Sequence, residues 1–221
     1  ILLRIAQTAA LALAAVLLLL VLAHVAGARR WSRVTAEIQT RMPRERGRYG
    51  PRDRTSVDLD VLAELPAPVR RYLRRALPVG GALIDRVQLT HSGTFNMGES
   101  TDRWSPFEST QLVLTTPPAF DWDARIRILP GLPARVHDAF VDGEGVLYAA
   151  ILGLFTVADQ RDSSAMAEGE LMRFLAESPW YPTVLMPGQG VVWSAVDDQT
   201  AEATLTTDAH TVTLRFTFGA D

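Results

Sequence analysis

Residues 121–128 read DWDARIRI, and this stretch decides the fold class. Every second residue in it is apolar, and the residues between them are charged. Successive side chains of a β-strand point to opposite faces of a sheet, so the alternation predicts a strand with one buried face and one polar face. The apolar set is Trp122, Ala124, Ile126 and Ile128, and the charged set is Asp121, Asp123, Arg125 and Arg127.

The same twofold period continues on both sides of this stretch. In residues 87–95, apolar and polar side chains alternate and place His91 on the apolar face. Turn-forming pairs such as Pro130-Gly131 separate successive runs. Short strands at regular spacing favour an antiparallel sheet built of meanders over parallel βαβ units. The predicted strands are residues 87–95, 107–115, 121–128, 134–141, 146–157, 191–196, 201–206 and 211–218.

Two segments have helical spacing instead. Residues 68–77 form an apolar stripe and leave four arginines on the other face, where they contact either water or anionic lipid headgroups. Residues 168–178 form a second apolar stripe, which the bulky apolar loop of residues 180–186 follows. We therefore predict an α+β fold, mostly antiparallel β, in which a helical insertion interrupts a curved sheet, or half-barrel.

The N-terminal residues 8–28 carry no charge and read TAALALAAVLLLLVLAHVAGA. About 20 helical residues span the roughly 30 Å hydrocarbon core of a bilayer, so this run predicts a transmembrane helix that makes the chain a single-pass cell-membrane protein. A cleaved signal peptide is the alternative, because Ala26, Gly27 and Ala28 form a small-residue site. Arginines are more frequent after the helix than before it, which taken alone places the domain in the cytoplasm.

Length and composition fit one domain and an anchor. We divide the 221 residues into an anchor at 1–28, an Arg-rich juxtamembrane linker at 29–56 and a β-rich domain at 57–221, after which we expect a further strand. The net charge of -3 predicts no nucleic-acid partner. Because the chain has no cysteine, it has no disulfide, no thiolate metal site and no lipidated cysteine. Anchoring is therefore expected from the peptide itself, through the lipid bilayer around residues 8–28.

The loop after the second helix is the candidate binding site. Aromatic residues, prolines and a methionine outside a regular element are typical of a pocket rim, and an apolar helix and loop set within a sheet would cover one of its faces. The expected ligand is a lipid or another apolar molecule. No cofactor or metal ion is predicted, since the four histidines lack metal-ligand spacing. The predicted rim residues are Trp180, Tyr181, Leu185, Met186, Phe174 and Trp122.

An enzymatic alternative uses Asp121, Asp123 and His137, which the pattern places on neighbouring strands. Carboxylates and an imidazole within hydrogen-bond reach would provide the acid-base pair of a hydrolase or isomerase. Ordinary cross-strand ion pairs on a solvated face would need the same mixture of charges. The chain has no phosphate-binding glycine loop, HExxH or GxSxG motif, which favours a binding module over an enzyme. An envelope scaffold with a filled core is a third alternative.

Several blocks of sequence also carry a family resemblance. They include LPAPVRRYLRRALP at residues 65–78, FDWDARI at 120–126 and EGELMRFLAESPWYPTVLMP at 168–187. These blocks resemble a bacterial and archaeal family catalogued only as a domain of unknown function, number sixty-five forty-four, and the resemblance implies no activity or cofactor. The order of helix, strands, helical insertion and strands is similar to that of the Lol-type periplasmic lipoprotein carriers. That likeness implies a lipid-binding half-barrel on the extracytoplasmic side of the membrane.

Overall fold

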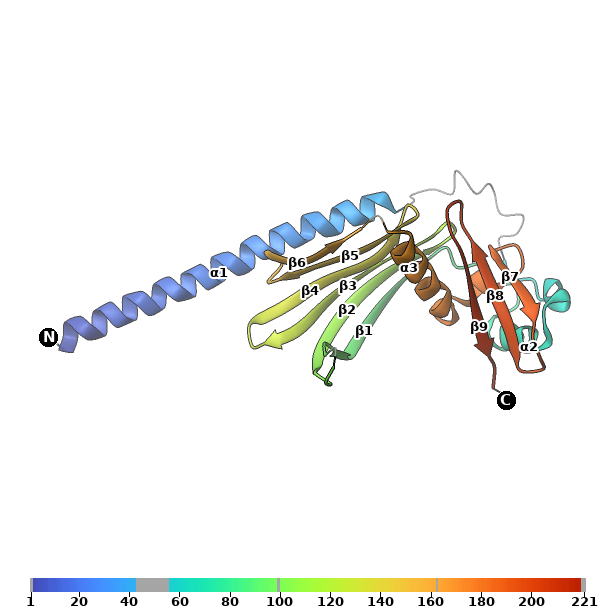
Figure 1. Ribbon diagram of the computed structural model, residues 1–221, viewed down its shortest axis with the longest axis horizontal. Helices are drawn as coiled ribbons and strands as arrows, with labels where there is room; N and C mark the ends of the chain where they lie inside the picture. Colours follow the sequence, from blue (N-terminus) through green and yellow to red (C-terminus); the bar gives the residue numbers. More distant parts are fainter. Residues whose placement is uncertain (1, 43–55, 99, 162, 220–221) are drawn as a thin grey trace.

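The computed structural model describes residues 2–42, 56–98, 100–161 and 163–219. A 40-residue helix comes first, a six-stranded sheet follows, and a helical segment then leads to a three-stranded sheet. In Figure 1 the helix α1 projects far beyond one end of the larger sheet, and the smaller sheet lies at the other end of the domain. The elements are α1 Leu2–Arg41, η1 Asp60–Glu64, α2 Ala67–Ala76, β1 Arg86–Asn96, β2 Trp104–Thr115, β3 Pro118–Leu129, β4 Leu132–Val141, β5 Glu144–Ile151, β6 Phe155–Gln160, α3 Ser164–Ala176, η2 Ser178–Trp180, η3 Pro182–Leu185, β7 Val191–Ala195, β8 Thr200–Thr206 and β9 Thr211–Thr217.

The larger sheet is a meander in which each strand pairs antiparallel with the next, in the order β1-β2-β3-β4-β5-β6. Different elements cover its two faces. Phe120 and Phe140 belong to the main core, which also contains α3, α2 and the smaller sheet. Their neighbours Ala119 and Ala139 point the other way and form a separate core with α1. The sheet is therefore a middle layer with a helix on each side.

The predicted fold class is confirmed, because the chain is α+β and its strands are antiparallel with a helical insertion. The strands are divided between two sheets rather than placed in a single curved one, and the insertion lies between the sheets. The prediction of one strand over residues 146–157 is wrong. The chain turns at Leu152 and Gly153, whose φ angles are 56° and 72°, and so forms the two strands β5 and β6.

The helix α1 does not end with the apolar run. It continues through the predicted boundary at residue 28 to Arg41, so the first part of the expected linker is helical, while residues 43–55 lie outside the described residues. Trp31, Ile38 and Met42 are 2%, 1% and 4% exposed. The spacing of seven residues places Trp31 and Ile38 on one side of the helix, which packs on the sheet, and Met42 follows directly after the helix.

A glycine allows α1 to approach the turn between β5 and β6. A Cβ atom at Gly27 would lie 2.0 Å from the carbonyl oxygen of Leu152, and a Cβ atom at Gly153 would lie 2.8 Å from the carbonyl oxygen of Gly27. The Arg30 guanidinium also donates to the Leu154 carbonyl. The turn is thus held against the helix at the level where the apolar run ends.

The first part of α1 is apolar and uncovered by the rest of the chain. It is the one helix among the described residues that is long and apolar enough to cross a membrane, and none of its most apolar 18-residue window is buried within the protein. Leucines 17–20 are each about half exposed or more, with values from 49% to 64%. Exposing such a surface to water is unfavourable, so this part of α1 is a candidate single-pass anchor.

Substituting Gly27 tests the contact between α1 and the β5–β6 turn. We expect Gly27→Val to destabilise the chain by about 1–3 kcal/mol, because the added side chain overlaps the Leu152 carbonyl and forces α1 outward. The measurement is the free energy of unfolding in urea for the detergent-solubilised chain. Ala28→Val, at the next and exposed position, is the matched control, and an equal loss in both variants would contradict the close approach.

Candidate functional site

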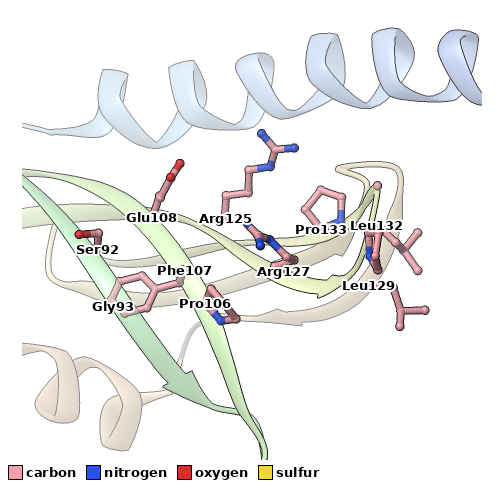
Figure 2. Close-up of a pocket in the computed structure, with 12 residues that line it drawn as sticks. Ser92, Gly93, Pro106, Phe107, Glu108, Arg125, Arg127, Leu129, Leu132 and Pro133 are labelled. Carbon is pink, nitrogen blue, oxygen red and sulfur yellow. The ribbon is translucent and has the colours of Figure 1, made fainter.

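A cleft of about 600 Å³ lies at the end of the larger sheet beside the apolar part of α1. Figure 2 shows Arg125 and Glu108 extending from adjacent strands toward α1, with Leu129 and Leu132 at the outer end. Arg125 pairs with Glu108 in the β2–β3 register, and Arg127 follows on the same face of β3. The cleft therefore combines charged side chains from strand interiors with apolar side chains from the β3–β4 turn.

The two arginines of the cleft have no ion-pair partner among the described residues. Arg125 and Arg127 are exposed, and neither makes an ion pair or a side-chain hydrogen bond with any residue that the structure describes. Glu108 is the one acidic residue among those that line the cleft. An exposed guanidinium keeps its charge and offers several N–H donors in one plane, a geometry that suits phosphate or carboxylate. The cleft is thus suited to an anionic group beside an apolar one.

The cleft lies close to the end of the apolar run. The Nε2 atom of His24 is 3.1 Å from the carbonyl oxygen of Gly131, which lies in the β3–β4 turn and lines the cleft. Gly131 has a φ of 76°, a conformation that glycine adopts without strain and that closes this tight turn. The outer end of the cleft is therefore one helical turn inside the predicted end of the membrane segment at residue 28.

The structure brings together the acid-base trio of the enzymatic alternative. The Nδ1 atom of His137 lies 2.7 Å from Asp121 Oδ1, and its Nε2 atom lies 4.0 Å from Asp123 Oδ2. This proximity follows from the sheet, because Asp123 and His137 are paired residues on β3 and β4 and Asp121 is two residues away on the same face. The three side chains share the face that α1 covers.

The helix supplies the remaining partners of this trio. Trp31 Nε1 donates to Asp123 Oδ1 at 2.9 Å, and Gln39 Nε2 donates to Asp121 Oδ2 at 3.1 Å. Thr35 Oγ1 lies 2.9 Å from His137 Nε2. The indole of Trp31 also stacks on the imidazole, with ring centres 4.5 Å apart. Both imidazole nitrogens are engaged and His137 is fully buried, so the trio connects α1 to the sheet.

The Asp123 carboxyl has a perturbed environment. Burial raises its pKa above the ordinary value, while His137 and the hydrogen bond from Trp31 act in the opposite direction. A polar hollow of about 130 Å³ adjoins Asp121 and Asp123 and is also lined by Gln39. Among the described residues, no group of three or more His, Asp or Glu side chains is arranged to hold a metal ion.

The predicted rim residues do not form one rim. Phe174, Tyr181, Leu185 and Met186 are at most 2% exposed and belong to the main core. The Tyr181 hydroxyl donates to the Phe174 carbonyl at 2.6 Å, and burial raises its pKa well above the ordinary value. These side chains fill the space between α3 and the smaller sheet.

Of the two predicted tryptophans, Trp122 is buried in the same core and Trp180 lies at the surface. Trp180 is 52% exposed, and its ring centre is 5.2 Å from that of His91. Trp122 lies within 6.3 Å of Phe95 and 5.9 Å of Phe107, measured between ring centres. These aromatic contacts form a surface on the apolar side of β1–β3. Leu185 also borders an apolar hollow of about 240 Å³ near Trp193.

A charged cluster beneath α3 is absent from the sequence predictions. Arg173 pairs with Asp138 at 2.5 Å and with Glu177 at 2.9 Å, and it lies 5.2 Å above the ring of Trp122. Burial and the negative charge of Asp138 raise the pKa of Glu170 to about 8. The spacing of three and four residues around Arg173 was a visible signal for ion pairs on one helix face. The sequence has no such signal for the third partner, Asp138 on β4.

Glu170 makes stability depend on pH. The pKa of Glu170 in the folded chain, about 8, lies above the ordinary value of 4.5. Between these two pH values the folded chain holds a proton that the unfolded chain has lost. Stability therefore falls as the pH rises from about 5 to about 8 and levels off above that range. We expect Glu170→Gln to flatten this decline and to exceed the wild type by more than about 1 kcal/mol at pH 9.

Urea unfolding of both proteins at pH 5, 7 and 9 provides the measurement. Glu64→Gln is the control, because Glu64 is exposed on η1. A Glu170→Gln protein that keeps the wild-type slope between pH 5 and pH 9 would show that Glu170 ionises normally in the folded state.

Comparison with known proteins gives a family and no activity. A family described as a family of unknown function, DUF6920, matches residues 63–221. The chain belongs to this family. The match confirms the expectation of a family of unknown function but bears a different number from the one that the sequence blocks suggested. Searches of curated proteins and of solved structures gave no match, so the likeness to the Lol-type carriers stays a prediction.

Proposed function

We propose that this DUF6920 protein is a membrane-anchored lipid-binding module whose cleft beside α1 takes the anionic headgroup of a lipid. The observation that carries the proposal is the position of the cleft. Gly131, which lines the cleft, contacts His24 of α1, so the cleft lies next to the end of the apolar run. A lipid in the bilayer around α1 would reach it with its headgroup at the arginines and its chains directed to the membrane.

The chemistry of the cleft fits such a ligand. Its volume of about 600 Å³ lies within the range of about 300–1,000 Å³ that is usual for small-molecule sites. Arg125 and Arg127 provide guanidinium donors for phosphate oxygens. Leu129 and Leu132 provide apolar contact on the side that faces the membrane-proximal end.

The predicted rim around Trp180 and Trp122 remains part of this proposal in a modified form. Trp122 is buried on the other face of the sheet, and the neighbouring rings of Trp180 and Phe95 are about half exposed. This surface would accept an acyl chain or another apolar ligand. The buried Phe174, Tyr181, Leu185 and Met186 would support it from beneath.

Neutralising the two cleft arginines tests the headgroup site. We expect Arg125→Gln/Arg127→Gln to weaken binding of an anionic lipid roughly 10- to 30-fold, since each arginine contributes about 1 kcal/mol toward an anionic headgroup. The measurement is a native mass spectrometry titration of the full chain in mild detergent with short-chain phosphatidylglycerol. Phosphatidylcholine of the same chain length serves as the reference lipid.

The matched control is Arg74→Gln/Arg75→Gln, which removes the same charge from the exposed face of α2. This control should bind phosphatidylglycerol as the wild type does. If it loses affinity as much as the cleft variant, the effect is one of overall charge, and if only the control loses affinity, the arginine face of α2 holds the headgroup instead.

The enzymatic alternative has one observation in its favour, namely the 2.7 Å contact between His137 and Asp121. The seating of α1 argues against it, because Thr35 engages the second imidazole nitrogen and His137 is fully buried. A general base must reach the proton that it removes. For a hydrolase or isomerase to use this trio, substrate would have to displace α1 from the sheet.

A further inference from the structure

We infer that the membrane-proximal turns of the larger sheet lie in the lipid surface, so that the domain rests on the bilayer instead of standing away from it on a linker. The partner of these turns is the interfacial region of the bilayer that surrounds α1. The inference rests on the proposed membrane span of α1 and is independent of any ligand in the cleft.

The contacts of α1 set the position of the turns relative to the bilayer. Residues 8–28 extend for about 32 Å as a helix, which is close to the roughly 30 Å hydrocarbon core of a bilayer. His24, four residues before the end of this run, contacts the β3–β4 turn at Gly131. Gly27 contacts the β5–β6 turn at Leu152 and Gly153. Both turns are therefore level with the last helical turn of the apolar run, within about 6 Å of helix rise from its end.

The exposed side chains at these turns match that position. Leu129, at the end of β3, is 58% exposed, and Phe155, at the start of β6, is 65% exposed. Val157, two residues farther along β6, is 62% exposed. Large apolar side chains at a sheet end are unfavourable in water and favourable at a membrane interface. The arginines of the cleft lie just behind them, as expected for groups that reach the headgroup layer.

The opposite end of the same sheet provides an internal comparison. In Figure 1 the turns β3–β4 and β5–β6 lie toward the N-terminal part of α1, and the turns β2–β3 and β4–β5 lie at the other end. The β4–β5 turn consists of Asp142 and Gly143, and neither it nor the turn at Thr116-Pro117 carries an exposed large hydrophobic side chain. The exposed large hydrophobic side chains at the turns of this sheet are thus at one end, where Phe95 and Trp104 also flank the β1–β2 turn.

The continuity of α1 makes this contact obligatory once the helix spans the bilayer. The helix runs without a break from the apolar run to Arg41, and Trp31 and Ile38 fix its later part to the sheet. Among the described residues there is no spacer between the apolar run and its first contacts with the sheet turns, at His24 and Gly27. The domain therefore has no freedom to rise from the surface unless the packing of α1 on the sheet is lost.

Depth measurements on the full chain in vesicles test this inference. The sequence has no cysteine, so Leu129→Cys and Phe155→Cys each provide one site for an environment-sensitive NBD label. Val192→Cys is the matched control, because Val192 is 70% exposed on β7 in the smaller sheet. The vesicles contain phosphatidylcholine and phosphatidylglycerol, with and without lipids that carry a doxyl quencher near the headgroup.

We expect the labels at residues 129 and 155 to emit at shorter wavelength than the label at 192 and to be quenched several-fold more strongly by the doxyl lipids. Equal quenching at all three positions would overturn the inference. A blue shift at residues 129 and 155 without doxyl quenching would assign the turns to a protein contact, such as a second copy of the chain, and would overturn it as well.

The labelled chains also separate this inference from the proposed function. Arg125→Gln/Arg127→Gln should keep the doxyl quenching at residue 129 even where its affinity for phosphatidylglycerol falls. Quenching together with no lipid bound in the cleft would retain the surface contact and reject the headgroup site. Lipid binding without quenching would retain the headgroup site and reject the surface contact.

Discussion

The buried contact between the later half of α1 and the larger sheet is the constraint on which the rest of the structure depends. Asp121 and His137 are 1% and 0% exposed. Burying a polar group without a hydrogen bond costs about 2–7 kcal/mol, and an unpaired charge costs more. The two side chains contact each other, and the helix supplies their remaining partners, since Gln39 donates to Asp121 and Thr35 contacts His137. The buried polar groups of Asp121 and His137 have all these hydrogen-bond partners only while α1 packs on the sheet. The helix and the sheet therefore behave as one body.

This coupling has a geometric consequence. Because the Gly27 contact and the Trp31 stacking lie a single helical turn apart, the helix cannot rotate on the sheet without losing either close packing or a buried hydrogen bond. The β5–β6 turn, held by Gly153 against the helix, then keeps its height relative to the apolar run. The apolar run of α1 thus fixes the position of these turns, and strand register carries that position to the cleft.

Local patterns predicted the elements better than their partners. The alternation at residues 121–128 correctly gave the strand and its two faces, and it placed Asp121, Asp123 and His137 together because a sheet fixes such neighbours. Residues 34–42 show a short helical pattern in the sequence, but its continuity with the apolar run and the packing of Trp31 and Ile38 on the sheet were not predictable, since the arginines after residue 28 are typical of a membrane flank. The loop at residues 180–186 has the composition of a pocket rim, yet its short 3-10 turns pack Tyr181, Leu185 and Met186 into the core between two sheets. Composition cannot distinguish a rim from a filled core, because both need large apolar side chains; only the presence of a second sheet decides.

The charged face of β3 shows how one strand serves two purposes. Asp121 and Asp123 lie where α1 crosses the sheet, and the helix uses their hydrogen-bonding capacity to dock. Arg125 and Arg127 lie two and four residues farther along, beyond that contact, and are left exposed. A charge that the fold has already paired adds little to recognition, whereas an unpaired guanidinium beside apolar side chains still has its donors to offer. The hydrogen bonds from Trp31 and Gln39 therefore separate the structural charges of this strand from the two arginines that remain for a ligand.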